Sequence, residues 1–251
     1  MSNGSIIFGL HAVEAALKQD ADAIEQLWCD KQRRDKRLHG LLQLAARKGI
    51  KVQTLSRAEL DKMAPGGKHQ GVVAQLAQTT AATARNETFL EQLVTDLDVA
   101  PFLLVLDGVT DPHNLGACLR SADAAGVHAV IAPRDRACGL TPVVRKVASG
   151  AAETVPFVQV TNLSRTIKSL RDAGVWVIGT ALEEGAVSLY ERDLKGPLAL
   201  VLGAEGKGIR RLTRENCDDL IYVPMAGSVQ SLNVSVATGI CLFEALRQRN
   251  S

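Results

Sequence analysis

The chain has 251 residues, 46% of them hydrophobic and 22% charged, and its formal net charge is +2. That length and composition fit a globular protein with room for two modest domains. The sequence contains no apolar run of the ~18 residues that a membrane span needs, and its first residues lack the basic and long apolar regions of a signal peptide. Its five cysteines are scattered, odd in number and without a Cys-x-x-Cys pair. This argues against a disulfide framework or a zinc site, and it predicts a reducing, cytoplasmic location.

Positive charge is concentrated in the N-terminal part of the chain. Residues 1–79 hold 12 Lys and Arg against 8 Asp and Glu, a net of +4, whereas residues 80–251 hold 17 against 19, a net of −2. Five of the cations fall within residues 31–37, at a turn that we expect to be exposed and able to contact phosphates. A basic part beside a near-neutral remainder indicates contact with a polyanion. The alternative is an ordinary solvated face.

Residues 6–76 alternate between helix and strand patterns and are expected to form a small α/β domain. Apolar spacing predicts helices around residues 10–17 and 38–45, and Gly49 ends the second. A capping box, Ser56 to Glu59, predicts the start of a third helix. The expected strands are residues 24–29, 50–52 and 72–76.

The composition changes after this domain. Residues 77–85 are small and polar and show no periodicity, which is typical of a linker. Phe89, Leu93 and Leu97 then mark a helix that leads into a second domain. We therefore expect a first domain at residues 1–77, a linker with its lead-in helix at 78–99, and a second domain at 100–251.

Strand and helix patterns alternate more strongly from residue 102 onward. One expected helix has Asp111 as its N-cap and Pro112 at its first position. The last helix, from Asn233 through Phe243, is apolar almost all round and is predicted to be buried. This alternation predicts a parallel sheet with helices on both faces. The expected strands are residues 102–106, 127–131, 155–160, 175–179, 198–202 and 220–223.

A glycine-rich loop with Gly203, Gly206 and Gly208 follows the strand expected at residues 198–202. Glycine lets a backbone approach a bound molecule closely, and ligands of open α/β sheets lie beyond the carboxyl ends of strands. The loop has neither the GxxxxGK[ST] order of a phosphate loop nor the GxGxxG order of a dinucleotide site. It therefore predicts a ligand loop of another kind, the alternative being a surface turn.

Two further strand ends lead through polar residues into helices. Asn114 and Arg120 follow the strand at residues 102–106, and Ser231 and Asn233 precede the last helix. Six helical positions would separate Asn114 from Arg120 by ~120°, so the two share a site only if Asn114 lies in the loop or first turn. Each residue alone also fits a cap or a surface position. Three such loops in one domain indicate a common site.

The stretches at residues 107–121, 202–208 and 224–239 resemble the three signature motifs of the SpoU (TrmH-type) family of RNA ribose methyltransferases. The resemblance covers nearly all of residues 102–247. Within the family it is strongest to the bacterial enzymes that 2′-O-methylate a guanosine in the peptidyl-transferase region of 23S rRNA. Residues 5–76, which include His69-Gln70-Gly71, resemble the family's N-terminal substrate-binding domain.

The resemblance implies a fold, a cofactor and partners. The second domain would be an α/β, parallel-sheet SPOUT fold with a C-terminal trefoil knot, and it would form a homodimer. It would bind S-adenosyl-L-methionine and a loop of 23S rRNA, with no metal. Carried over residue by residue, the catalytic positions are Asn114, Arg120, Glu205 and Asn233. The cofactor-binding positions are Gly203, Val223 and Leu232, with Thr180, Met225 and Ser231 as further candidates.

The implied reaction transfers a sulfonium methyl group to a ribose 2′-hydroxyl. A guanidinium keeps its proton above pH ~12, so we expect Arg120 to clamp a substrate phosphate or to stabilise a developing alkoxide. Asn114 and Asn233 would orient the ribose or Arg120, and Glu205 would fix Asn114 or the arginine. Two alternatives stay open: a tRNA ribose methyltransferase of the same family, and an RNA-binding ribosome-assembly factor without catalysis.

Overall fold

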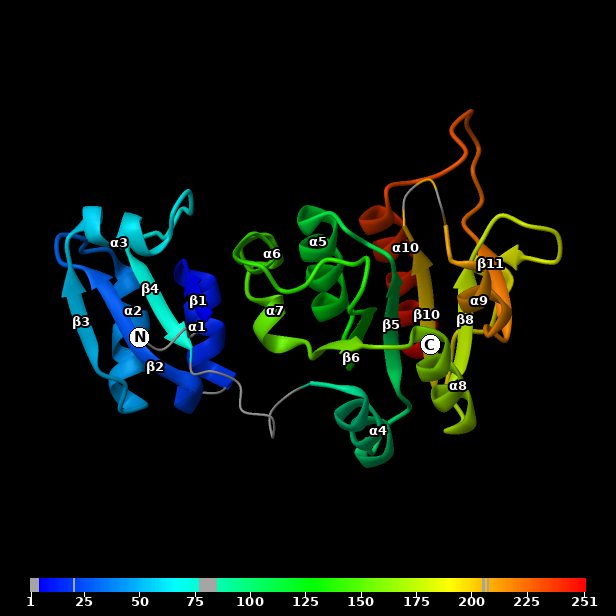
Figure 1. Cartoon of the computed structure of the whole chain (residues 1–251), viewed down its shortest axis with the longest axis horizontal. Helices are drawn as coiled ribbons and strands as arrows, with labels where there is room; N and C mark the ends of the chain where they lie inside the picture. The colour runs from blue at the N-terminus through cyan, green and yellow to red at the C-terminus, as the bar shows by residue number, and fades with distance from the viewer. Residues whose placement is uncertain (1–4, 20, 77–84, 205, 207) are drawn as a thin grey trace. The chain divides into compact units, whose positions relative to one another are not determined.

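The computed structural model describes residues 5–19, 21–76, 85–204, 206 and 208–251 (Figure 1). Two compact units make up the chain: residues 1–84 with 142–154, and residues 85–141 with 155–251. Residues 77–84 of the expected linker, and the candidate Glu205, lie outside the described residues. None of the described helices is long and apolar enough to cross a membrane.

The N-terminal unit contains a four-stranded sheet in the order β1-β4-β2-β3. Strand β4 runs antiparallel to β1 and β2, whereas β2 and β3 run parallel. The helices and the strands expected at residues 24–29 and 72–76 are confirmed, whereas the strand expected at residues 50–52 begins only at Val52 and runs to Leu55. Strand β1 is an addition that the sequence did not predict. The strands are β1 (Ser5–Phe8), β2 (Ile24–Asp30), β3 (Val52–Leu55) and β4 (Val72–Leu76); the helices are α1 (Leu10–Gln19), α2 (Lys36–Arg47), α3 (Arg57–Met63) and the 3-10 turn η1 (Ala21–Ala23). Helices α6 (Pro142–Ala148) and α7 (Ala151–Thr154) are grouped with this unit.

Local caps and one apolar core explain these elements. The Asp35 carboxylate accepts the backbone N–H groups of Arg37 and Leu38 and starts α2, and the predicted capping box of Ser56 and Glu59 starts α3. Buried apolar residues of α1 and α2 pack on β2 and β4 in one cluster that includes Leu17. The segment at residues 31–37 leaves β2 at the rim of this sheet, so its cations stand clear of the core.

The second unit is built on a parallel sheet, as the sequence predicted, and the sheet has seven strands where six were expected. Its strands are, in spatial order, β7 (Phe157–Val160), β6 (Ala129–Pro133), β5 (Phe102–Asp107), β10 (Leu198–Gly203), β8 (Trp176–Thr180), β11 (Asp219–Tyr222) and β9 (Val187–Ser188). Each neighbouring pair is parallel. All the carboxyl ends therefore meet at one edge of the sheet. The trefoil knot stays a prediction.

Helices cover both faces of this sheet (Figure 1). Helices α4 (Glu87–Asp96) and α8 (Leu163–Asp172) pack on the face that carries Leu103, Val105 and Val201. Helices α5 (Pro112–Ala124) and α10 (Val234–Arg249) pack on one another, and α10 also packs on β10. Strand residues alternate between faces, so burial on both faces explains why β5 and the first five residues of β10 are wholly buried.

The strand boundaries differ from the predicted ones where the chain leaves a helix or meets a proline. Strand β6 begins at Ala129 and not at residue 127, because the Val127 N–H still bonds the Ala122 carbonyl at the exit of α5. Strand β7 begins at Phe157 and not at residue 155, directly after Pro156, which has no N–H to donate. The short elements β9, α7, α9 (Arg211–Glu215) and η3 (Leu189–Glu191) were not predicted.

The prediction that the last helix is buried was wrong for one of its faces. Val236 is 50% exposed and Phe243 is 48% exposed, seven positions apart on the same side of α10. The opposite side is buried and includes Thr238, Cys241 and Leu242. Helix α10 therefore has two apolar faces. One packs against the rest of the chain, and the other is exposed at the surface.

Candidate functional site

The carboxyl ends of three neighbouring strands, β10, β8 and β11, carry three of the candidate residues. Thr180 ends β8 and pairs in register with Ile221 of β11, and Val223 directly follows the end of β11. Gly203 ends β10, on the other side of β8. Neighbouring strands lie ~4.8 Å apart, so these backbone positions span about 10 Å along one edge. The structure thus brings Thr180, Gly203 and Val223 together.

The loop after β10 folds back on the strand end. The Gly208 N–H donates to the Ala204 carbonyl at 2.9 Å, which closes a small turn. A Cβ added to Gly203 would overlap the backbone of Gly208 and Ile209, so only glycine fits there. Gly206 and Gly208 have φ of 73° and 62°, in the left-handed region that favours glycine. The predicted ligand loop is therefore a tight backbone turn that leaves main-chain groups at the sheet edge.

The start of α5 lies beside this loop. The Ala204 N–H donates to the Asp107 carbonyl at 3.2 Å, which ties the end of β5 to the glycine loop. The Asp107 side chain is fully buried and accepts both the backbone N–H and the guanidinium of Arg210. Asp111 caps α5 by accepting the His113 N–H. Asn114 consequently stands in the first turn of α5, the position that sharing a site with Arg120 required.

Asn233 links the third stretch to the first. It is the N-cap of α10 and accepts the Ser235 N–H at 2.9 Å, while its side-chain amide donates to Asn114 Oδ1 at 3.0 Å. The two asparagines are 119 positions apart in the sequence. Their hydrogen bond is direct evidence that these two motif-like stretches form one site. Leu232, directly before Asn233, is half-buried at the start of α10.

Helix α10 is held against α5 below this hydrogen bond. Cys118 and Thr238 are both buried, and their Sγ and Oγ1 atoms lie 3.4 Å apart. Burial raises the pKa of the Cys118 thiol to about 11, so it stays protonated and unreactive at neutral pH. The packed pair of helices fixes the distance between the two asparagines. Neither Cys118 nor Thr238 was singled out from the sequence, because a single buried thiol or hydroxyl carries no motif.

The other described candidates are at least partly exposed. Arg120 is exposed on α5, and its side chain makes no hydrogen bond or ion pair within the part of the chain that the structure describes. Val223 is half-buried, and Ser231 is exposed in the loop that leads from Met225 to α10. The structure therefore joins Asn114 to Asn233 but leaves Arg120 free to meet a bound molecule.

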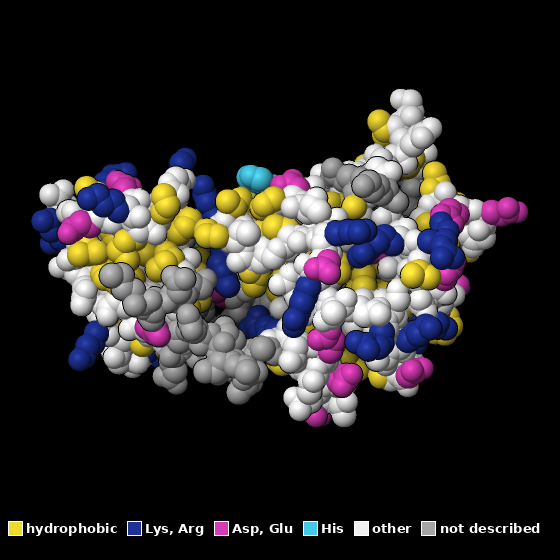
Figure 2. Space-filling view, in the orientation of Figure 1, with side chains coloured by type: hydrophobic (Ala, Val, Ile, Leu, Met, Phe, Trp, Pro, Cys, Tyr) yellow, Lys and Arg dark blue, Asp and Glu magenta, His cyan; other side chains and the backbone are white. Residues whose placement is uncertain are grey.

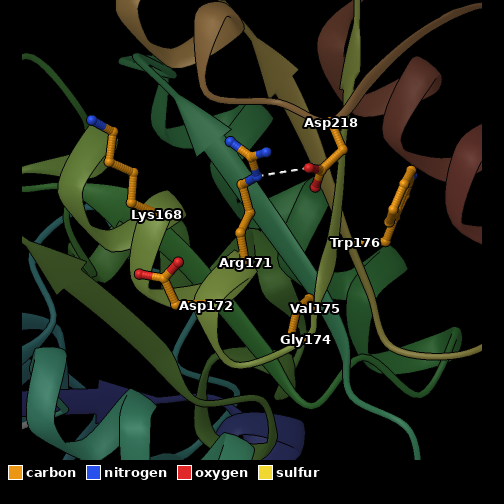
Figure 3. Close-up of a pocket in the computed structure, with 7 residues that line it drawn as sticks. All are labelled: Lys168, Arg171, Asp172, Gly174, Val175, Trp176 and Asp218. Atoms are coloured by element: carbon orange, nitrogen blue, oxygen red, sulfur yellow. Dashed lines mark hydrogen bonds and ion pairs between the residues drawn. The ribbon is translucent and has the colours of Figure 1, made fainter.

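A hollow of the second unit lies elsewhere. It has a volume of about 640 Å³ and is lined by the end of α8, the start of β8 and Asp218 (Figure 3). Figure 3 shows Arg171 and Asp218 pointing toward one another, and their ion pair is 2.7 Å long. Asp218 also accepts the Val177 N–H, and the Trp176 indole donates to Asp219. This hollow is at the amino ends of the strands, the edge opposite the candidate residues.

A basic segment of the N-terminal unit forms a second candidate surface. Lys31, Arg34 and Arg37 are exposed, and Lys and Arg side chains gather along the upper rim of this unit in Figure 2. Arg33 differs, because it pairs with Asp35 and packs on Gly71. Hydrogen bonding to Arg33 and to the start of α2 lowers the pKa of the Asp35 carboxyl, so it stays charged as the helix cap.

Two family descriptions match the chain. Residues 101–243 match the SpoU rRNA Methylase family, and residues 6–81 match a domain described as RNA 2′-O ribose methyltransferase substrate binding. The first match covers more than half of the chain. The chain belongs to the SpoU rRNA methylase family. This membership confirms the resemblance that the three stretches predicted, and the matched residues include the sheet edge described above.

The relatives of this SpoU methylase match along its full length. The 23S rRNA (guanosine-2'-O-)-methyltransferase RlmB of Shewanella oneidensis is 57% identical and covers 100% of both chains. The protein of the same name in Escherichia coli is 53% identical over 98% of this chain and 99% of its own. The solved structure of the AdoMet-bound rRNA methyltransferase from Sinorhizobium meliloti has a TM-score of 0.75 and 26% identity, and covers 96% of this chain and 86% of that one.

Proposed function

We propose that this SpoU methylase transfers a methyl group from S-adenosyl-L-methionine to the ribose 2′-hydroxyl of a guanosine in 23S rRNA. The full-length similarity to proteins named for that reaction supports the substrate. The observation that carries the proposed chemistry is the hydrogen bond between Asn114 and Asn233, beside the strand ends of a parallel sheet. From the family resemblance we further propose that this guanosine lies in the peptidyl-transferase region.

The edge formed by β10, β8 and β11 fits the cofactor. Its width of about 10 Å suits a nucleoside, and the tight turn at Gly203 presents backbone groups where a side chain would fill the space. We assign cofactor contacts to Gly203, Val223, Leu232 and, beside them, to Thr180, Met225 and Ser231. When bound, S-adenosylmethionine supplies an electrophilic methyl group. The chain's own residues then have to present one ribose hydroxyl to it in line.

Asn114 and Asn233 are suited to that positioning. Their amides are fixed by α5, by the cap of α10 and by one another. The two side chains therefore lose little conformational entropy when a ribose binds. Arg120 supplies a permanent positive charge on the exposed side of α5. It would bind a phosphate of the substrate in a bidentate manner or stabilise the oxygen as negative charge develops on it. Glu205 would hold Asn114 or Arg120 in place.

The N-terminal unit would select the RNA. Its match to a substrate-binding domain and its exposed cations at residues 31–37 support this role. Duplex RNA hides its base edges, so a specific site is expected to be a loop. We propose the division into a substrate-binding domain at residues 1–77, a linker with its helix at 78–99 and a catalytic domain at 100–251, working in the cytoplasm.

The exposed apolar face of α10 supports a homodimer of the catalytic domain. Val236 and Phe243 are about half exposed, and a large aromatic side chain gains from burial against a partner. A second copy of the chain would cover both. Because Asn233 caps the same helix, a dimer through this face would place the partner close to the site.

Labelled cofactor and two RNAs test the reaction. The purified protein should label a 23S rRNA fragment and leave tRNA unlabelled, and mapping of 2′-O-methyl sites in cells that lack the protein should show one missing guanosine. Labelled tRNA would favour the tRNA enzyme, and cofactor binding with no transferred label would favour a non-catalytic assembly factor.

An arginine variant tests the assignment of the site. Arg120→Ala should lower kcat/KM for the 23S rRNA fragment at least about 100-fold, because either proposed role acts on the reacting nucleotide. Arg165→Ala removes another exposed arginine, on α8, and should keep wild-type activity. Full methyl transfer by Arg120→Ala would contradict both roles.

A further inference from the structure

Arg136 is one of three described residues other than glycine with a left-handed backbone, the others being Gln70 and Ser149. Ser149 directly follows the end of α6, a position where helices commonly take up this conformation. The φ of Arg136 is 57° in the loop between β6 and α6. An L-residue with a side chain in this region is uncommon and strained, and such strain gathers at functional positions. Glycine would adopt the same conformation without that strain. The side chain of Arg136 therefore needs an explanation.

No internal contact explains it. In the N-terminal unit, Gln70 also has a positive φ, of 50°, but its side-chain oxygen accepts the Leu10 N–H at 3.2 Å and so fixes the start of α1. The Arg136 guanidinium is exposed and makes no hydrogen bond or ion pair within the described part of the chain. The Arg136 guanidinium is thus available to bind a molecule other than this chain.

The backbone around Arg136 is anchored on both sides. The Arg134 N–H donates to the Val160 carbonyl at 2.9 Å, and the Cys138 N–H donates to the Val109 carbonyl at 2.8 Å. Arg136 stands between these two anchors, at the tip of the turn. A fixed turn presents the guanidinium from a defined place on the sheet edge, which is the condition for precise recognition of a ligand.

The second anchor places this turn beside the methyl-transfer site. Val109 lies between β5 and the cap residue Asp111, five positions before Asn114. A Cβ built on Gly108 would have Ala204 of the glycine loop 3.8 Å away and the Arg136 carbonyl 3.9 Å away. The backbone of Arg136 and the residue that follows β10 therefore both lie next to Gly108, which has no side chain.

The order of the strands indicates which bound molecule Arg136 would contact. The proposed cofactor positions lie on β10, β8 and β11, whereas Arg136 follows β6, on the opposite side of β5. The first turn of α5, with Asn114, lies between them. An anion near Arg136 is consequently not the cofactor but part of the molecule that brings the acceptor hydroxyl. In RNA the anions next to a ribose are the phosphates of the same strand, and a guanidinium binds phosphate in a bidentate manner.

We propose that Arg136 binds a backbone phosphate of the RNA strand that carries the acceptor ribose, and so fixes that strand over α5. This inference rests on the proposed function and adds a substrate contact to it. Arg120 and Arg136 would then hold the strand at two points near Asn114 in the first turn of α5. Arg136 is a substrate-binding residue and takes no part in the chemistry at the methyl group.

The test uses a variant that relieves the strain while it removes the charge. Arg136→Gly keeps the left-handed backbone at no steric cost, so the protein should fold at least as stably as the wild type. RNA binding is measured by fluorescence anisotropy with a 23S rRNA fragment over a range of salt concentrations, and cofactor binding is measured separately. Lys195→Ala, an exposed cation just before β10 at the opposite edge of the sheet, is the matched control.

We expect Arg136→Gly to weaken RNA binding and to raise the KM for RNA about tenfold, because the variant cannot form the charge-assisted hydrogen bonds to a phosphate. The slope of log Kd against log salt should fall by about 0.7, the value for one phosphate of a single strand. Cofactor affinity should stay within about twofold of the wild type, because no cofactor position is changed. Arg136→Lys should recover part of the affinity, since it restores the charge but not the planar fork.

Two results would overturn this role. One is RNA affinity of Arg136→Gly equal to that of the wild type, and the other is an equal weakening in Lys195→Ala. Failure of the proposed function gives a different result, because it appears in the wild-type protein as absent methyl transfer to 23S rRNA. The ratio of variant to wild-type RNA affinity reports on Arg136 alone.

Discussion

Asn233 combines two roles in one side chain, and these can be separated by choice of substitution. Its oxygen caps α10, and its amide nitrogen donates to Asn114. Serine also caps helices well but is too short to replace the amide donor. Asn233→Ser should therefore keep stability within about 0.5 kcal/mol and lose activity, whereas Asn233→Ala should lose both, with about 1 kcal/mol less stability.

The asparagine pair should act as a unit in catalysis. We expect Asn114→Ala and Asn233→Ser each to lower kcat/KM about 10- to 100-fold, because a displaced substrate loses its alignment. The double variant should lose little more than one single variant, since both break the same hydrogen bond. Steady-state kinetics on an rRNA fragment measure this, and losses that multiply would show that the two residues act separately.

Gly203 is required by the shape of the backbone around it. A Cβ there would overlap main-chain atoms of Gly208 and Ile209, which cannot rotate away as a side chain can. Gly203→Ala should lower the free energy of unfolding by about 3 kcal/mol and abolish cofactor binding. Gly227→Ala has open space around its Cβ and no positive φ, so it serves as the control. Urea unfolding measures both, and equal stability of the two variants would contradict the prediction.

Residue types at the site could be predicted from the sequence, but their partners could not. Asn114 and Asn233 stand in stretches with a recognisable family resemblance, so the sequence alone made both of them candidates. That they bond one another depends on the packing of α5 against α10. Asp107 was missed, because a single aspartate at a strand end carries no signal, yet it is fully buried and holds Arg210 beside the glycine loop.

At the scale of elements, α10 is fastened at its C-terminal end by Arg249. Its guanidinium donates to the Gly196 carbonyl and, at 2.7 Å, to the Ala100 carbonyl, and it lies 4.9 Å from the centre of the Phe102 ring. The Phe102 N–H in turn donates to His128 Nδ1 at 2.9 Å. The last helix is thus tied to the amino ends of β5 and β10, opposite its functional end.

This cluster predicts a loss of stability in acid. Burial and the nearby Arg249 lower the pKa of His128 below its ordinary value in the folded protein. The stabilising contribution is therefore complete above pH ~6.5, the unfolded value, and is lost as the pH falls through the folded one. Between about pH 7.5 and pH 5 the wild type should lose more unfolding free energy than His128→Gln. Equal losses in urea unfolding would contradict this.

The elements themselves were predictable where a local signal defines them. Caps at Asp35, Ser56 and Asp111 and the apolar runs of the parallel strands placed most helices and strands correctly. The exposed face of α10 could not be foreseen, because periodicity reports that a residue is apolar and not what covers it. Strand β9 has two residues and no pattern of its own.

At the scale of the whole molecule, the charge is distributed in line with the two proposed tasks, RNA binding and methyl transfer. The basic surplus lies in the N-terminal part, and the catalytic part is near neutral. RNA affinity and its dependence on salt should therefore reside mainly in the first unit, whereas cofactor affinity should not depend on it. This separation follows from composition alone, but only the structure shows which cations are free to bind, since Arg33 is already paired and packed.

A triple variant of the free cations tests this separation. Lys31, Arg34 and Arg37 are exposed around the start of α2, and replacing all three by Gln leaves Arg33 and the Asp35 cap in place. The slope of log KM for rRNA against log salt should fall by about 2, at ~0.7 for each phosphate that the variant no longer neutralises. Cofactor affinity should stay within about twofold, because no residue of the β8, β10 and β11 edge is changed.

The same helix provides the control. Arg47, Lys48 and Lys51 are three exposed cations at the other end of α2, and their replacement by Gln changes the net charge of the unit by the same amount. If RNA recognises a place on the unit, the first triple variant loses rRNA binding and the second does not. If only overall charge attracts the RNA, the two variants weaken binding equally, and a defined phosphate-binding surface at residues 31–37 is ruled out.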